Sequence, residues 1–235
     1  MNIAFPGATP HQREHQAITH LARILPDAEA DGLITSWFFI RKGHWRVRYL
    51  PADAHNADQS LQRQLAAPDV EAIGDIYEPE IHAFGGIASM NTAHQLFHAD
   101  SHHLLTYLNG TPTDRREHSL ILCTALMRQA GLDFGEQGDV WARLADQRAP
   151  LRQEPPDPAT WNAHTTSVRD LLLGNPRPHA IAEDWLAAFQ RAGRQLRTLR
   201  NTGQLTRGIR AVTAQHVIFH WSRIGIPAPT QALLA

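Results

Sequence analysis

Two arginines, Arg46 and Arg48, stand two positions apart in a run rich in aromatic and β-branched residues. This run, residues 44–51, follows a similar one at 36–41 across the turn Lys42-Gly43, a pattern typical of a β-hairpin. Because side chains alternate across a strand, the two guanidinium groups are expected on one face, about 7 Å apart. Such a pair could hold a carboxylate or stabilise an enolate-like charge. The strand pattern fits a solvated charged face equally well, and that is the commoner case.

Histidine spacing raises the question of a metal site. His94 and His98 are four positions apart with Asp100 close by, and His11 and His15 repeat the spacing. Residues four apart share a helix face, as many zinc ligands do. Neither pair has the glutamate of the H-E-x-x-H pattern or a third ligand at a motif spacing. With fifteen histidines in the chain, coincidental pairs are expected, and we predict no metal.

Acidic and glycine-rich segments follow the hairpin. Glu78 and Glu80 flank a proline in the segment 77–80, so they could form a paired acid/base site, although a solvated turn is the commoner meaning of the pattern. Gly85-Gly86 lacks the spacing of a phosphate-binding loop, so nucleotide binding is not supported. We expect these glycines to allow a sharp turn or the close approach of a peptide.

The order of these pieces resembles a known family. The motifs are Trp-Phe-Phe-Ile-Arg at 37–41, the Arg46 and Arg48 pair, Tyr-Glu-Pro-Glu at 77–80, Phe-Gly-Gly at 84–86 and the segment 94–101. They resemble the small C-terminal-type domain of lantibiotic dehydratases, which also occurs as a standalone thiopeptide-type bacteriocin biosynthesis protein. The resemblance implies action on ribosomally made peptides. Some members eliminate glutamate from glutamylated Ser or Thr, and others join two dehydroamino acids in the pyridine-forming step of thiopeptide assembly.

The resemblance also implies site residues. Arg46 and Arg48 would hold the glutamate and stabilise developing charge, and His220, with His216 behind it, is the expected acid/base group, because histidine titrates near neutrality. The expected substrate-binding residues are Arg41, Tyr77, Glu80, Asp100 and Ser101.

Two departures from the family pattern weaken these assignments. Ala83 stands where the family has an arginine. Ile218 stands where the eliminating members carry a histidine, with His216 and His220 two residues to either side.

The expected reaction is glutamate elimination, a lyase activity that needs no cofactor. The chain offers no obvious room for a glutamyl-transferring domain, so the glutamylated precursor peptide would come from a separate glutamyl-tRNA-dependent dehydratase subunit. Three alternatives stay open. The first is a pyridine-forming cyclase, which Ala83 favours, and the second is a non-catalytic subunit that binds the precursor peptide, or its partner enzyme, through the open edge of the hairpin. The third is an α+β domain whose arginines and histidines are merely surface residues. A homodimer is also left open.

Composition excludes several classes of protein. The chain has 235 residues, 43% of them hydrophobic and 19% charged, with a formal net charge of −1. These values suit a globular protein and argue against a general nucleic-acid or membrane-surface binder. We see no apolar run long enough to span a membrane and no signal peptide, so a cytoplasmic location is expected. Cys123, in an apolar helical run, is predicted to be a buried thiol.

The predicted fold class is α+β, with a small antiparallel or mixed sheet in the N-terminal half packed with helices and a mostly helical C-terminal half. A single domain over residues 1–235 is predicted, with a Pro-rich loop near 150–158. Besides the hairpin we expect a strand at 70–77. Helices are expected at 11–25 (ending at Pro26), 61–67, 90–108 (bent or broken at Asp100-Ser101), 119–130, from 139 onward, 159–173, 180–199 and 208–223.

Overall fold

The computed structural model describes residues 1–53, 56–110, 112–151, 157–173 and 181–235. The chain divides into two compact units, which are described separately below. Unit 1 comprises Met1–Pro79 and Phe97–Pro112, and unit 2 comprises Glu80–Leu96 and Thr113–Ala235. The single domain therefore stays a prediction.

Unit 1 contains a four-stranded antiparallel sheet in the order β2-β3-β1-β4. Its strands are β1 (Asn2–Ala4), β2 (Ile34–Lys42), β3 (His44–Pro51) and β4 (Glu71–Ile73). The predicted hairpin and the α+β class are confirmed. β1 was missed because three residues are too few to show alternation, and β4 is shorter than the strand expected at 70–77.

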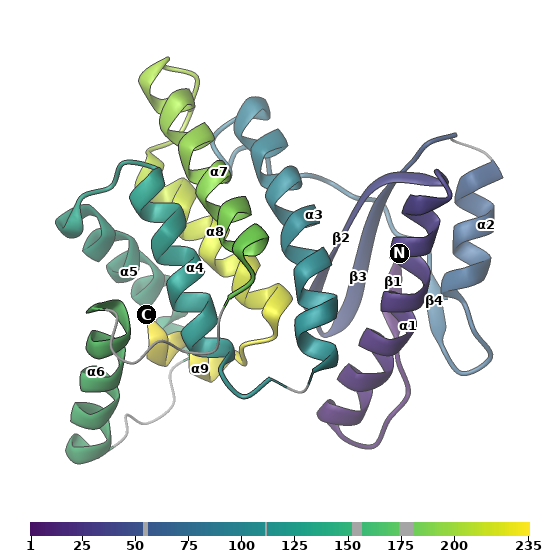
Figure 1. The fold of residues 1–235 in the computed structure, drawn as a ribbon, viewed down its shortest axis with the longest axis horizontal. Coiled ribbons are helices and arrows are strands. Elements are labelled where there is room, and N and C mark those ends of the chain that lie inside the picture. The colour runs from purple at the N-terminus through teal and green to yellow at the C-terminus, as the bar shows by residue number, and fades with distance from the viewer. Residues whose placement is uncertain (54–55, 111, 152–156, 174–180) are drawn as a thin grey trace. The chain divides into compact units, whose positions relative to one another are not determined.

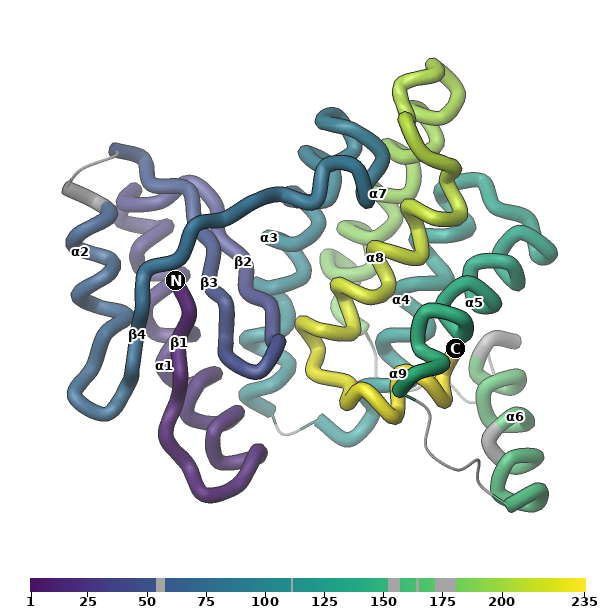
Figure 2. The backbone as a smooth tube through the Cα atoms, turned by 180° about the vertical axis from the view of Figure 1, so that it is seen from behind, coloured from purple at the N-terminus to yellow at the C-terminus, as the bar shows by residue number. Residues whose placement is uncertain are grey.

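One face of the sheet is covered by α1 (Pro10–Ala30), which contacts both β2 and α2 (Asn56–Leu65). Figure 1 shows α1 in front of the strands, and Figure 2 shows the sheet from the opposite side. The predicted end of this helix at Pro26 is wrong. Proline removes one helical hydrogen bond, but the buried Leu25 and Ala28 on either side keep the last turns packed.

Helix α3 (Ile87–Asn109) is continuous, so no new helix begins at Asp100-Ser101 and the break predicted there is wrong. Both side chains are fully buried. Ser101 Oγ accepts a hydrogen bond from the backbone N–H of Phe39 on β2 at 3.3 Å. The serine therefore satisfies a donor at the edge of the sheet and does not cap a new helix, a choice that depends on a strand distant in sequence.

Unit 2 is helical, as predicted. It contains the first turns of α3 together with α4 (Arg115–Gln129), α5 (Phe134–Arg148), α6 (Pro158–Leu173), α7 (Glu183–Asn201), α8 (Ile209–Ile224) and α9 (Ala228–Leu234). Helix α8 contacts α4 and α5, and most of its residues are buried. A helix that is buried on all sides forms the core of its unit.

Helix boundaries in unit 2 follow local signals. α5 begins before the predicted Asp139, because Asp133 and Glu136 form a capping box at its start. The single Cys123 on α4 is buried, as expected. Most of the Pro-rich loop predicted near 150–158 lies outside the described residues, between the short 3₁₀ helix Ala149–Leu151 and α6. No helix in the described part of the chain combines the length and apolar character needed to cross a bilayer.

Candidate active site

Arg46 and Arg48 share one face of strand β3, as the alternation predicts. Their cross-strand partners on β2 are Ile40 and Phe38, respectively. Arg46 is exposed, whereas Val47 between the two arginines is completely buried on the α1 side. The hairpin thus presents two guanidinium groups from a rigid backbone on the face turned away from α1.

Arg48 has partners that the sequence did not reveal. Its Nη2 lies 2.6 Å from Asp75 Oδ2, and its guanidinium lies 5.6 Å from the centre of the Tyr77 ring. The hydrogen bond from Arg48, helped by the charges of Arg48, the N-terminal amino group of Met1 and Arg46, holds the pKa of Asp75 below its usual value. Asp75 therefore marks a position where a carboxylate is stabilised beside both arginines.

Arg41 lies on the opposite face of the hairpin. Its Nη2 is 2.6 Å from Glu14 Oε2 on α1, and its guanidinium lies 4.8 Å from the ring centre of Trp45. The structure therefore separates Arg41 from Arg46 and Arg48 by the thickness of the sheet, and its expected role in substrate binding stays a prediction.

The other expected substrate-binding residues of unit 1 have internal contacts. Tyr77 packs edge-on against Phe38, with ring centres 5.8 Å apart, on the same face as Arg48. Asp100 and Ser101 are fully buried in α3, and the Ser101 hydroxyl is engaged by Phe39. Tyr77 is thus the one that the structure places beside the arginine pair.

His216 and His220 lie one turn apart on α8 in unit 2, and both are buried. The His216 ring packs edge-on against Phe84, and the His220 ring against Phe189, each with centres 5.0 Å apart. Burial, reinforced by the positive charge of Arg223, lowers the pKa of His216 to about 3. At neutral pH His216 is an uncharged ring within an aromatic core.

The loop before α3 packs on this helix. Gln215 Nε2 donates a hydrogen bond to Glu80 Oε2 at 2.8 Å, so Glu80 lies beside the start of the histidine segment. Gly85 adopts a φ of +83°, and a Cβ there would lie 2.8 Å from Val212 Cγ2. The glycine therefore allows both a left-handed turn and close contact with α8, in agreement with the sharp turn predicted from Gly85-Gly86.

Ala83 replaces the arginine of the family motif, and the side chain of another arginine binds its backbone carbonyl group. Arg207, from the loop between α7 and α8, donates a hydrogen bond from Nη1 to the Ala83 carbonyl oxygen at 2.9 Å. The two positions are 124 residues apart in the sequence. Sequence comparison by motif alone could not have connected them.

A family model described as "Lantibiotic biosynthesis dehydratase C-term" matches residues 8–235. The chain belongs to this family. The match covers both units, including the arginine pair and the two histidines, and confirms the family suggested by the motifs. No match was found among curated protein sequences.

A solved structure shares the fold of this lantibiotic dehydratase C-terminal family member. It is the crystal structure of the tRNA dependent lantibiotic dehydratase MibB from Microbispora sp. 107891, with a TM-score of 0.58 and 18% identity. The similarity covers 99% of this chain but only 27% of MibB. The chain thus spans about a quarter of the length of that protein.

The candidate residues fall into two groups, one in each unit. In unit 1, Arg46 and Arg48 share one face of the sheet and Tyr77 lies beside Arg48. In unit 2, His216 and His220 lie on one helix. Sequence reasoning missed Asp75 and Arg207. Asp75 stands two residues before Tyr77, which is a weak signal, whereas nothing local indicates the contact of Arg207. The described donor groups suited to a metal ion are Glu29, His98 and His102 of unit 1.

Proposed function

We propose that this chain eliminates glutamate from glutamylated Ser or Thr residues of a ribosomally made precursor peptide, leaving dehydroalanine or dehydrobutyrine. The observation that carries the proposal is the pair Arg46 and Arg48 on one face of β3, at the positions of the paired arginines in the family motif. Family membership supports the setting in lantibiotic biosynthesis.

The reaction explains why an arginine pair is suitable. A base removes the Cα proton of the modified residue, the Cα–Cβ double bond forms, and the Cβ–O bond breaks to release glutamate as a carboxylate. Negative charge builds first on the amide oxygen and then on the leaving group. Two fixed guanidinium groups can bind the free glutamyl carboxylate and stabilise the charge on the leaving carboxylate without rearranging.

Asp75 supports a carboxylate-binding role for this face. Its carboxylate sits 2.6 Å from Arg48 and has a lowered pKa. The Asp75 side chain is 32% exposed and that of Arg48 is 11% exposed, so Asp75 is the partner that solvent reaches more readily. A glutamyl carboxylate of the substrate could therefore replace Asp75 at Arg48.

The proton-transfer role is proposed for His220, with His216 second. The pKa of His216, lowered to about 3, makes it a weak base at neutral pH. Both rings are buried, so either role requires the ring to become accessible when substrate binds. Arg207, at the Ala83 carbonyl, is proposed to supply the cation that the family motif places at Ala83.

The glutamylated peptide would come from a separate partner. MibB is described as tRNA dependent, and this chain spans about a quarter of it. We propose that a glutamyl-tRNA-dependent dehydratase subunit performs the glutamyl transfer and that this chain acts afterwards, without a cofactor and without binding nucleic acid itself.

The test is mass spectrometry of a peptide carrying O-glutamylated serine, incubated with the wild-type protein and with Arg46→Ala, Arg48→Ala and Arg63→Ala. Arg63 is a matched control, because it is an exposed arginine on α2 that bonds to the backbone of its own helix. We expect loss of glutamate with wild type and Arg63→Ala. With the other two variants the rate should be lower by a factor of about 100 or more. Unchanged glutamyl adducts with folded wild-type protein would exclude elimination.

Pyridine-forming cyclisation is the second candidate, because a cyclase need not bind glutamate and Ala83 lacks the arginine side chain of the family motif. Its test is a peptide with two dehydroalanines, monitored by mass spectrometry for the cyclised product. Glutamate loss from the first peptide, with no change to the second, would favour elimination.

A further inference from the structure

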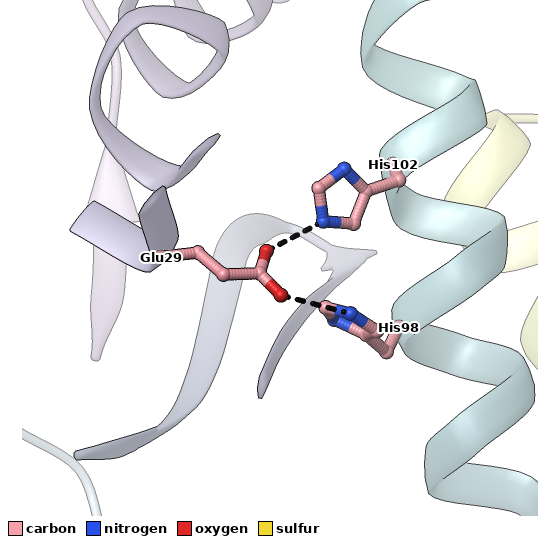
Figure 3. Close-up of side chains that lie close together, drawn as sticks. All are labelled: Glu29, His98 and His102. Atoms are coloured by element: carbon pink, nitrogen blue, oxygen red, sulfur yellow. Dashed lines mark hydrogen bonds and ion pairs between the residues drawn. The ribbon is translucent and has the colours of Figure 1, made fainter. Parts of the chain in front are cut away.

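Three side chains with metal-binding donor atoms converge within unit 1. Glu29 comes from the last turn of α1, and His98 and His102 lie one turn apart on α3 (Figure 3). Glu29 Oε2 lies 2.7 Å from His102 Nε2, and Glu29 Oε1 lies 3.3 Å from His98 Nε2. All three donor groups fall within 4.8 Å of one another. The sequence spacing pointed instead to His94 with His98, and gave no sign of Glu29.

The His98 ring is oriented by the backbone of β2. Its Nδ1 lies 2.9 Å from the carbonyl oxygen and 3.1 Å from the amide nitrogen of Trp37. In the tautomer that donates from Nδ1 to the carbonyl, the lone pair of Nε2 points toward Glu29. A hydrogen bond from the second ring nitrogen to a backbone carbonyl is the usual arrangement for a metal-bound histidine.

Trp37 also fixes the carboxylate. Its indole Nε1–H donates a hydrogen bond to Glu29 Oε2 at 2.8 Å, and its ring lies 4.4 Å from the His102 ring, measured between centres. The Trp37 side chain is completely buried. A rigid residue therefore contacts all three members of the cluster, so the donor atoms are held in place before any ion arrives.

The cluster is accessible and electrostatically suited to a cation. The side chains of Glu29, His98 and His102 are 28%, 25% and 38% exposed. A carboxylate and two imidazoles that solvent can reach form a donor set that an entering divalent cation can use.

The observed distances are close to those of a coordination sphere. In a tetrahedral zinc site with bonds of about 2.0–2.1 Å, neighbouring donor atoms lie about 3.4 Å apart. The His98 Nε2–Glu29 Oε1 distance of 3.3 Å already matches, and the His102 Nε2–Glu29 Oε2 distance of 2.7 Å needs to widen by less than about 1 Å. The widest separation among the donor atoms is within 4.8 Å, so it needs to shorten by about 1.4 Å or less. Two imidazoles and one carboxylate leave a fourth position for water and suit late divalent transition metals.

We propose that Glu29, His98 and His102 bind one divalent transition metal ion, with Zn²⁺ as the expected occupant. The ion cross-links the end of α1 to α3, beside the edge strand β2. It would stabilise unit 1 on the face of the sheet opposite Arg46 and Arg48. The proposal is independent of the elimination reaction.

The first experiment is isothermal titration of chelator-treated full chain with Zn²⁺, with Co²⁺ absorption spectra as a signature of coordination. We expect one tight site and a rise in Tm of roughly 5 °C when it is filled. Glu29→Gln and His102→Gln should each weaken binding by about tenfold or more. The matched control is the double variant His11→Gln with His15→Gln, an exposed pair with the same spacing on α1, which should bind as wild type does.

Two results would overturn the proposal: Zn²⁺ affinity that is unchanged in both cluster variants, or tight binding that is lost in the His11 and His15 control. Circular dichroism verifies that each variant is folded. Trp37→Phe provides a second route, because it retains all three ligands and removes only the hydrogen bond to Glu29. A several-fold loss of affinity there would support the proposal, and wild-type affinity in Trp37→Phe, Glu29→Gln and His102→Gln alike would exclude it.

Discussion

Strand β3 of unit 1 and helix α8 of unit 2 each carry a pair of ionisable side chains, but in opposite environments. Arg46 and Arg48 project from a strand whose other face is buried; Arg46 is exposed, and the Arg48 side chain keeps 11% of its surface exposed. His216 and His220 project from a helix that is buried nearly all round. The same kind of motif therefore yields an exposed arginine beside a largely buried, ion-paired arginine in unit 1, and two buried rings in unit 2.

The difference lies in how each element meets its neighbours. A strand at one surface of a two-layer structure has an inner and an outer face, so period-two alternation separates charge from core. A central helix has no outer face, and a polar side chain on it must be neutral or paired. Alternation along β3 therefore predicts which side chains share the outer face, whereas spacing along α8 does not predict which rings reach solvent.

The largest expected effect tests the burial of His216. The folded protein keeps this ring neutral down to about pH 3, whereas the unfolded chain takes up a proton below about pH 6.5. Stability is therefore lost as pH falls from 6.5 toward 3, by up to roughly 1.4 kcal/mol per pH unit from this group. His216→Leu should reduce the slope in urea unfolding measured between pH 7 and pH 4.

The control for this experiment is His11→Gln, since His11 is exposed on α1. Its pH slope should equal that of wild type. Equal slopes for wild type and His216→Leu would instead mean that His216 takes up a proton in the folded state. The difference in environment between strand β3 and helix α8 would then not hold.

An intermediate effect tests the two faces of the hairpin. Arg41→Ala removes the ion pair with Glu14 and the contact with the Trp45 ring. Both partners are largely buried, so we expect a loss of about 1 kcal/mol in the free energy of unfolding. The elimination rate should fall by less than about fivefold, far less than for Arg46→Ala.

Chemical unfolding and the glutamylated-peptide assay measure the two quantities for Arg41→Ala. A rate loss as large as that of Arg46→Ala would show that the substrate reaches the α1 face of the sheet. In that case the expected substrate-binding role of Arg41 would gain support, and the division of roles between the faces would have to be abandoned.

The smallest expected effect concerns Asp75. If its carboxylate competes with the substrate for Arg48, Asp75→Asn should lower the KM for the glutamylated peptide by up to about fivefold, with kcat little changed. Steady-state kinetics measure both constants. A higher KM would mean that Asp75 orients Arg48 for binding and does not compete with the substrate.

Several features were predictable from the sequence because their causes are local. Alternation in residues 44–51 predicted the arginine face, and the Lys42-Gly43 turn predicted the hairpin that displays it. Apolar spacing predicted the helices of the second half, and motif order predicted the family that the model match over residues 8–235 confirms. Each of these signals lies within a few residues of the structure that it determines.

Tertiary structure decided the rest, because the deciding contacts join residues far apart in the chain. Pro26 remains helical because the buried residues Leu25 and Ala28 pack the turns on either side of it. Ser101 accepts a hydrogen bond from the backbone of β2 and caps no helix. Arg207 reaches Ala83 across 124 residues, and Glu29 meets His98 and His102 only once α1 and α3 flank β2. Residue spacing in the sequence determines which side chains share a face. Packing alone determines what that face meets.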